Sequence, residues 1–211
     1  MSGMNVLVVG GGGREHALVI GLNESPSVDA IHIAPGNAGT AVLGLNHQVE
    51  AGDVDGLVSL SQHLEVDLVI VGPEGPLVDG LADRLREVGI SCFGPHSAGA
   101  ELEGSKLHAK KIMQELNIPT AGIILIENSE RIKEALDTFS PPWVVKRDVL
   151  AGGKGVVVTE SRKEAYEALS YGLESDGFVL LEEFLSGEEA SVLVIMDESG
   201  YVCLPPSQDH K

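Results

Sequence analysis

The chain has 211 residues, of which 43% are hydrophobic, and it carries 32 acidic against 14 basic residues for a formal net charge of −18. This length and composition suffice for one large or two small domains with buried cores. The negative charge disfavours nucleic acid and anionic membranes as partners, whereas small anionic ligands such as nucleotides can still bind at local clusters of lysine.

The cysteines and the N-terminus indicate a compartment. Cys92 and Cys203 are the only cysteines and lie far apart, which favours neither a disulfide framework nor a zinc site. The N-terminus leads directly into a short apolar run, without the features of a signal peptide, and no apolar run approaches the length that a membrane crossing requires. We therefore expect a cytoplasmic protein.

Residues 5–94 alternate short β-branched runs with runs of helical periodicity. This pattern predicts a βαβ series and a parallel sheet covered by helices. Glycine-rich loops follow three of the runs, at the strand ends where such sheets bind ligands. The predicted strands are Asn5–Val9, Val28–Ala34, Val66–Val71 and Ile90–Phe93, and the predicted helices are Arg14–Asn23, Val54–Leu64 and Leu77–Val88.

The first of these loops, Gly10–Gly13, follows a strand and opens a helix. Backbone N–H groups and the helix dipole favour an anion there. A dinucleotide fingerprint would need a glycine at Glu15, so a dinucleotide cofactor is the weaker interpretation, and a turn that only bends the chain is the alternative. Three polar side chains of the next two loops could line the same crevice or act only as turn formers and solvated groups; they are Asn37, Thr40 and Glu74.

The middle of the chain predicts a bridge between two domains. Ser105–Asn117 reads as a helix with Ser105 as its N-cap and an apolar face that includes Leu107 and Leu116. A small α+β domain should follow, and then a hairpin that turns at 197–200. Its predicted strands are Gly122–Ile126, Trp143–Lys146, Val156–Thr159 and Phe178–Glu182, and its predicted helices are Ser129–Phe139 and Ser161–Tyr171.

A glycine-rich loop, Lys146–Gly155, lies between two of these strands. A Walker A loop would open a helix, whereas Lys154 precedes Gly155 and four residues with strand propensity. The sequence instead favours a hairpin loop that closes over phosphates with its backbone N–H groups and two lysines. An ordinary glycine-rich hairpin with a solvated lysine is the alternative.

The segment Glu182–Leu185 ends a strand and turns into a loop. Such a segment can offer backbone groups to an adenine edge while a nearby carboxylate holds ribose hydroxyls; an exposed acidic loop is the alternative.

Seven motifs, taken in order, resemble the phosphoribosylamine–glycine ligases, also called glycinamide ribonucleotide synthetases, of the ATP-grasp superfamily. The resemblance covers the whole chain and corresponds to the N-terminal half of that family. The motifs are Val9–Ala17, Ala34–Thr40, Val71–Glu74, Glu103–Lys106, Lys146–Gly155, Glu182–Ser191 and Ser207–Lys211.

The resemblance implies an α/β fold in four parts. A parallel-sheet substrate domain would span 1–103, a bridging helix of the central domain 104–120, a small α+β lid 121–188 and the incomplete start of the central domain 189–211. It also implies the chemistry: ATP, with Mg²⁺, activates glycine as glycyl phosphate, and 5-phosphoribosylamine then displaces the phosphate to give glycinamide ribonucleotide in purine biosynthesis. The Mg²⁺ ligands are expected beyond residue 211, so no metal ligand is predicted in this chain.

The resemblance also assigns residues by matching position. Those expected to bind ATP are Lys106, Lys146, Gly152, Gly153, Lys154, Gly155, Glu182, Leu185 and Glu189. Those expected to form the phosphoribosylamine pocket are Gly11, Gly12, Gly13, Asn37, Thr40 and Glu74. Those expected near the reacting groups are Lys146, Lys154, Asp209, His210 and Lys211. Arg147 and Val149 depart from the alanine and glycine that are more usual in the family, and valine should stiffen the loop entrance.

Two other functions stay open at this point. The chain could be a non-catalytic nucleotide-binding module or a split subunit whose partner is a separate C-terminal half, or it could be another ATP-grasp ligase that joins a different carboxylate and amine. Under the leading hypothesis, we expect the 211 residues alone to bind phosphoribosylamine and ATP but to turn over poorly, and to expose apolar surface near 190–211.

Overall fold

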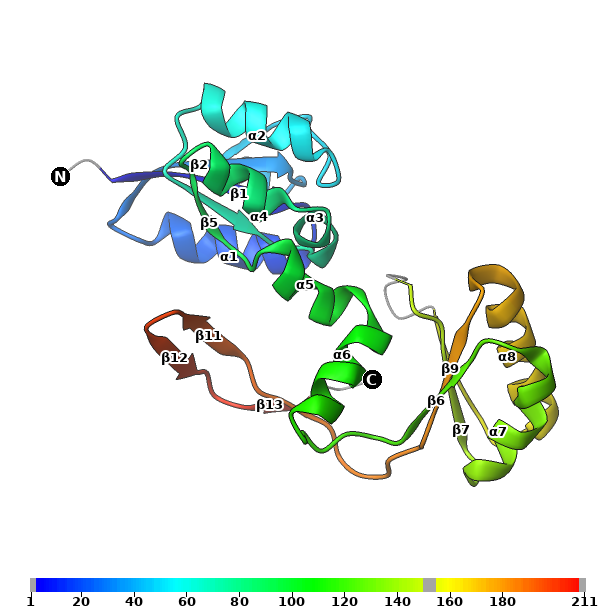
Figure 1. Cartoon of the computed structure of the whole chain (residues 1–211). Coiled ribbons are helices and arrows are strands. Elements are labelled where there is room, and N and C mark those ends of the chain that lie inside the picture. The colour runs from blue at the N-terminus through cyan, green and yellow to red at the C-terminus, as the bar shows by residue number, and fades with distance from the viewer. Residues whose placement is uncertain (1–2, 150–154, 209–211) are drawn as a thin grey trace.

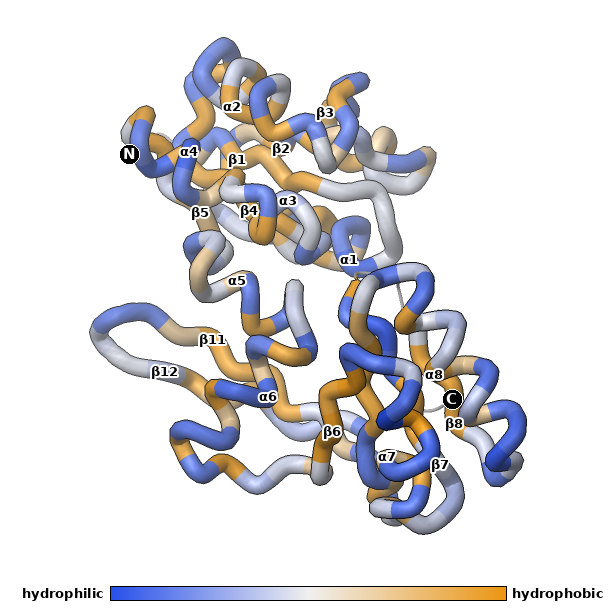
Figure 2. The backbone as a smooth tube through the Cα atoms, turned by 45° about the vertical axis from the view of Figure 1, so that its right-hand side comes forward, coloured by the Kyte–Doolittle hydropathy of each residue, from blue (hydrophilic) through white to orange (hydrophobic). Residues whose placement is uncertain are grey.

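A computed structural model describes residues 3–149 and 155–208. An N-terminal α/β body is joined through a bridging helix to a second, smaller body, and a hairpin extends on the same side as this connection (Figure 1). The hydrophobic residues concentrate in the strands of the two bodies, and the helices alternate hydrophobic and hydrophilic residues (Figure 2). Six residues with predicted site roles lie outside the described residues: Gly152, Gly153, Lys154, Asp209, His210 and Lys211.

The N-terminal body contains the predicted parallel sheet. Five strands follow the order β3-β2-β1-β4-β5, and all neighbouring pairs are parallel. Leu7 and Val9 of β1 enter one core and Val6 and Val8 enter another, so the sheet is buried on both faces. The strands are β1 Met4–Gly10, β2 Val28–Pro35, β3 Leu45–Asn46, β4 Leu68–Val71 and β5 Ser91–Phe93.

The helices of this body differ from the prediction in two respects: one predicted helix is divided, and two helical elements were not predicted. The helix expected over Leu77–Val88 is two helices, because Gly80 adopts a left-handed backbone with φ of 86° that an α-helix cannot contain. The 3₁₀ turn η1, strand β3 and helix α5 have no counterpart in the prediction. The elements are α1 Gly13–Asn23, η1 Thr40–Val42, α2 Val54–His63, α3 Glu74–Val78, α4 Leu81–Glu87 and α5 Ser97–Gly104.

The second body is an antiparallel sheet of order β6-β9-β7-β8, with α7 and α8 on one side of it (Figure 1). The predicted α+β architecture is confirmed, although α8 is longer than expected: Gly172 lies inside it, and Gly177, at φ of 82°, ends it. The elements are β6 Ile123–Ile126, η2 Ser129–Arg131, α7 Ile132–Thr138, β7 Trp143–Lys146, β8 Val156–Thr159, α8 Arg162–Asp176 and β9 Val179–Glu182.

Helix α6, Lys106–Glu115, bridges the two bodies. Ser105 is its N-cap as predicted, since the Ser105 side chain accepts a hydrogen bond from the backbone N–H of His108. The predicted apolar face is wrong in part: Leu116 is exposed, whereas Lys110, a charged residue, is buried.

The last described segment contains four short strands. The predicted hairpin is confirmed, with Asp197 paired to Gly200 at its turn. Its side chains are exposed, including Ile195, Met196 and Tyr201. The strands are β10 Ala190–Ser191, β11 Val194–Asp197, β12 Gly200–Cys203 and β13 Ser207–Gln208. Over the part of the chain described here, no helix combines the length and the apolar character that a membrane crossing requires.

Candidate functional site

The loops at the carboxyl ends of β1, β2 and β4 meet. Asn37 Nδ2 donates a hydrogen bond of 3.0 Å to the Gly11 carbonyl, and Gly36 N–H donates one of 3.1 Å to the Gly10 carbonyl. A Cβ at Gly11 would lie 2.7 Å from the Gly36 carbonyl oxygen, so only glycine permits this approach. The predicted proximity of the first two loops is therefore confirmed.

Asn37 and Thr40 stabilise the second loop by hydrogen bonds within it. Asn37 Oδ1 accepts hydrogen bonds from the N–H groups of Gly39 and Thr40 at 2.7 and 3.1 Å. The Thr40 hydroxyl is fully buried and bonds to Asn37 and to Asn46 Oδ1, which lies 2.9 Å away. Both predicted site residues thus act here as turn formers, and their contact with a ligand stays a prediction. Asn46 lies on the two-residue strand β3, which no sequence pattern predicted.

The Glu15 side chain lies against the glycines of the loops after β1 and β4. The Glu15 side chain is buried, and Oε2 accepts a 2.6 Å hydrogen bond from Gly12 N–H. A Cβ at Gly72, in the loop after β4, would lie 2.1 Å from Glu15 Oε1. Oε1 has no hydrogen-bond partner among the described residues. The carboxylate therefore occupies the position of the third glycine in a dinucleotide fingerprint, which supports the interpretation against a dinucleotide.

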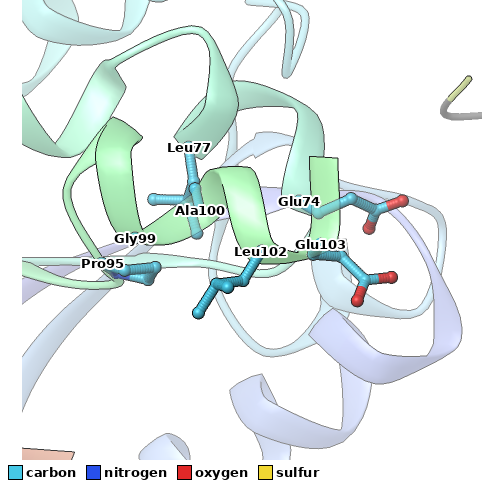
Figure 3. Close-up of a pocket in the computed structure, with 7 residues that line it drawn as sticks. All are labelled: Glu74, Leu77, Pro95, Gly99, Ala100, Leu102 and Glu103. Carbon is cyan, nitrogen blue, oxygen red and sulfur yellow. The ribbon is translucent and has the colours of Figure 1, made fainter. Parts of the chain in front are cut away.

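Glu74 begins α3 and lines a pocket between α3 and α5 (Figure 3). Its carboxylate lies at the same end of this pocket as that of Glu103, and Leu77, Pro95 and Ala100 line the other end. Two neighbouring carboxylates favour a cationic or hydrogen-bond-donating group and disfavour a phosphate. Glu74 is thus better suited to hydroxyl or amine groups than to the phosphate of a ligand.

Charged side chains from three elements converge at the end of β9. Glu182 is 3% exposed, and its Oε2 lies 2.7 Å from Lys146 Nζ of β7 and 3.6 Å from Lys110 Nζ of α6. Strands β7 and β9 are antiparallel neighbours with Val144 opposite Glu182, so Lys146, two residues after Val144, lies diagonally across from Glu182 on the same face of the sheet. The structure therefore joins two predicted nucleotide residues and adds Lys110, to which no motif had assigned a role.

The start of the glycine-rich loop is hydrogen-bonded to the N-terminus of α6. Asp148 accepts hydrogen bonds from the Ser105 hydroxyl at 2.7 Å and from Lys106 N–H, and Lys106 Nζ donates to the Val149 carbonyl at 3.2 Å. A carboxylate at this position also complements the helix dipole. Lys106 thus lies at the entrance of the loop, while its contact with ATP stays a prediction, and Asp148 is a structural residue that no sequence motif marked.

Arg147 fastens the base of the same loop to α8. Its N–H donates a 2.9 Å hydrogen bond to the Gly155 carbonyl, and its guanidinium makes two bonds of 2.6 and 2.7 Å to Asp176. The guanidinium carbon lies 5.3 Å from the centre of the Tyr171 ring. The hydrogen bonds from Arg147 lower the pKa of Asp176. Arg147, one of the two residues that depart from the family pattern, therefore links the chain after β7 to α8.

Leu185 and Glu189, two further predicted nucleotide residues, belong to the segment after β9. Leu185 is exposed in the chain that follows β9, and Glu189 is also exposed, one residue before β10. Glu183, next to Glu182, instead accepts a 3.1 Å hydrogen bond from Gly122 N–H. The part of the chain that the structure describes contains no group of three or more His, Cys, Asp or Glu side chains arranged to hold a metal ion.

The chain combines a parallel α/β domain, a bridging helix and an antiparallel α+β domain whose strands flank a glycine-rich loop. Lysines gather beside a carboxylate at a strand end of the second domain. Together these features define an ATP-grasp protein. Residues 4–103 match the family "Phosphoribosylglycinamide synthetase, N domain", and residues 104–211 match "Phosphoribosylglycinamide synthetase, ATP-grasp (A) domain". The chain belongs to the phosphoribosylglycinamide synthetase family.

Known proteins agree with this assignment. The chain is 46% identical over 208 residues to a phosphoribosylamine–glycine ligase of Streptomyces coelicolor and 44% identical over 213 residues to that of Mycobacterium tuberculosis; each match covers 99% of this chain and 49% or 50% of the relative. The crystal structure of a phosphoribosylamine–glycine ligase from Thermotoga maritima matches with a TM-score of 0.77 and 33% identity, over 96% of this chain and 49% of that one. The chain spans about half the length of the curated relatives it matches.

Proposed function

We propose that the chain is the N-terminal half of an ATP-dependent ligase that joins glycine to 5-phosphoribosylamine. The carboxylate of glycine attacks the γ-phosphorus of ATP, and ADP leaves. The amine of phosphoribosylamine then attacks the carbonyl carbon of glycyl phosphate, and inorganic phosphate leaves with glycinamide ribonucleotide as the product. The observation that carries this proposal is the family match, which extends over both parts of the chain.

The chemistry suits a protein that positions reactants and neutralises charge. An acyl phosphate replaces a poor leaving group by phosphate, so amide formation needs little covalent help from the enzyme. Lysines near the phosphates stabilise the charge that develops during phosphoryl transfer. We propose Lys106, Lys146 and Lys154 for this role, with Gly152, Gly153 and Gly155 permitting close approach of the loop.

We propose that Glu182, together with Leu185 and Glu189, receives the adenosine end of ATP. The support comes from Glu182: its Oε1 is buried and has no hydrogen-bond partner among the residues described, while its Oε2 faces two ammonium groups. A buried acceptor without a partner costs free energy that a ligand can recover by donating a hydrogen bond. The exocyclic amine of adenine or a ribose hydroxyl is such a donor.

The loop Gly10–Gly13 is the proposed site for the phosphate of phosphoribosylamine, at the N-terminus of α1. The N–H of Gly12 is already bonded to Glu15, which leaves those of Gly11 and Gly13 to the phosphate. Asn37 and Thr40 shape the neighbouring loop, and Glu74 is proposed to face the amine or a hydroxyl of the same ligand, because its carboxylate would repel the phosphate.

The rest of the catalytic centre is proposed to need the other half of the family fold. The proposed Mg²⁺ ligands lie beyond residue 211, and Asp209 and Lys211 are proposed to stand near the reacting groups. The exposed apolar hairpin β11–β12 is a surface that the other half can cover. We further propose the limits 1–103, 104–120, 121–188 and 189–211 for the parts of the chain, and a cytoplasmic location for the enzyme.

ADP release tests this function. The 211-residue chain is incubated with ATP, glycine and phosphoribosylamine, alone and together with the C-terminal half of the Streptomyces coelicolor relative. We expect ADP release that requires both substrates only in the mixture. Rapid glycine-dependent ADP release by the chain alone would contradict the proposed division of the site, and release that prefers another amino acid or amine would indicate a different ATP-grasp ligase. ATP binding without turnover in the mixture would indicate a non-catalytic module.

A further inference from the structure

Lys110 is a buried lysine at the middle of the bridging helix α6. It is 8% exposed, whereas its neighbour Lys111 is exposed. Lysine is almost never buried unless its charge is paired, because the ammonium group loses its hydration. A buried lysine beside a proposed nucleotide site therefore needs a physical explanation.

The ammonium group of Lys110 donates two hydrogen bonds and lies within ion-pair distance of one carboxylate. It donates to Thr120 Oγ1 at 2.8 Å and to the Ala121 carbonyl at 3.0 Å, and it lies 3.6 Å from Glu182 Oε2. Thr120 and Ala121 belong to the connection between α6 and β6. Lys110 thus links the helix, this connection and the end of β9 at one point.

The two lysines beside Glu182 differ in exposure and in the number of hydrogen bonds that hold them. The side chain of Lys146 is 28% exposed and lies nearest to the carboxylate, whereas that of Lys110 is 11% exposed and is held by two further hydrogen bonds. Lys146 can turn towards a ligand, and Lys110 cannot without breaking its bonds to Thr120 and Ala121. The cluster holds two positive charges and one negative charge, so it also favours an anionic ligand.

We propose that Lys110 is a positioning residue that keeps Glu182 paired and oriented when Lys146 leaves it to bind a nucleotide phosphate. This inference rests on the proposed nucleotide roles of Lys146 and Glu182. With Lys110 in place, Oε2 keeps a cation, and the free Oε1 stays directed at a donor of the base or ribose. Without Lys110, either Lys146 stays with Glu182 and the phosphate loses a partner, or Glu182 becomes an unpaired buried charge.

The test compares ADP with inosine diphosphate, which carries a 6-oxo group in place of the 6-amino group. Their affinities for the 211-residue chain are measured by isothermal titration calorimetry. We expect Lys110→Met to weaken ADP binding about tenfold, which is the loss of one charge-assisted hydrogen bond, and to reduce the preference for ADP over inosine diphosphate. Lys111→Met is the matched control and should change neither quantity.

The preference ratio separates positioning from folding, because an unfolded fraction lowers the binding of both nucleotides equally. If Lys110→Met does not fold, Thr120→Val decides the question, since it removes one bond that holds Lys110 and should reduce the same ratio to a smaller extent. The inference is overturned if folded Lys110→Met keeps the wild-type ratio of ADP affinity to inosine diphosphate affinity. If Lys110→Met does not fold, the same result for folded Thr120→Val overturns it.

Glu182→Gln distinguishes this inference from the function on which it rests. We expect Glu182→Gln to lose the preference for ADP, as Lys110→Met does. If Glu182→Gln changes the ratio and Lys110→Met does not, only the role of Lys110 is wrong. If Glu182→Gln binds both nucleotides as the wild type does, or if the wild type binds neither, the proposed nucleotide role of Glu182 is itself wrong.

Discussion

The ion pair between Lys146 and Glu182 should contribute clearly to the stability of the second body. We consider the variants Lys146→Met, Glu182→Gln and the double variant, which together form a double-mutant cycle. The two charged atoms lie 2.7 Å apart, and the side chains are 28% and 4% exposed. Exposed pairs contribute about 0.2–1 kcal/mol, and removing one partner of a buried pair costs about 3–5 kcal/mol, so we expect a coupling free energy of about 2 kcal/mol here.

The same body contains a control pair of equal length. Arg162 and Asp137 are also 2.7 Å apart, but their side chains are 47% and 69% exposed. Solvent screens this pair, so its coupling free energy should be about 0.5 kcal/mol or less. Distance alone would predict equal values, whereas burial predicts a difference of several-fold.

Fluorescence reports the unfolding of this body directly. Trp143 is the only tryptophan of the sequence, and it is buried in β7 next to the strand that carries Glu182. Urea unfolding followed by tryptophan fluorescence therefore yields the four free energies of each cycle. A coupling for Lys146 and Glu182 that is no larger than that for Arg162 and Asp137 would refute the argument from burial.

Three further predictions follow from single contacts. Burial raises the pKa of the Cys92 thiol to about 11. The rate of its alkylation by iodoacetamide, measured by mass spectrometry, should therefore still increase about tenfold per pH unit from pH 8 to pH 10. A plateau in this rate below pH 9 would contradict the raised pKa. Gly11→Ala should lower the free energy of unfolding of the N-terminal body by about 1–3 kcal/mol, because the new Cβ would meet the Gly36 carbonyl. The control Gly13→Ala should be nearly neutral, because nothing lies within 4 Å of its Cβ. Urea unfolding followed by circular dichroism measures both values. Arg147 lowers the pKa of Asp176 from its ordinary value of 3.8, so the stability that this pair contributes is complete above that value and is lost as the pH falls through the lowered folded pKa. The difference in urea midpoint between wild type and Arg147→Ala should therefore shrink between pH 7 and pH 3. A constant difference would contradict the pairing.

Much of the fold followed from local patterns in the sequence. The β-branched runs of residues 5–94 predicted the parallel sheet, and Trp143–Lys146 and Val156–Thr159 were predicted with their observed limits. Two of the errors lie where one residue decides the backbone: Gly80 divides a predicted helix, and Gly177 ends α8 later than expected. A left-handed glycine and a tolerated helical glycine read the same way in a sequence, since only the fold determines φ.

The candidate site was predictable where a motif carries its residues and unpredictable where contacts cross the fold. Glycine turns and strand-end positions marked Gly11, Asn37, Lys146 and Glu182. Lys110 was missed because helical periodicity places it among polar residues, and its partners Thr120, Ala121 and Glu182 come together with it only in the folded chain. Residues such as this one are paired by tertiary structure, which no local pattern records.

The transfer of oxygen from glycine to phosphate tests the central proposal most directly. The 211-residue chain is combined with the C-terminal half of a relative and supplied with ATP, phosphoribosylamine and glycine labelled with ¹⁸O in its carboxylate. Formation of glycyl phosphate predicts that each inorganic phosphate released carries one ¹⁸O atom, because the attacking carboxylate oxygen leaves with the phosphate. Unlabelled phosphate from a reaction that consumes ATP would contradict the account.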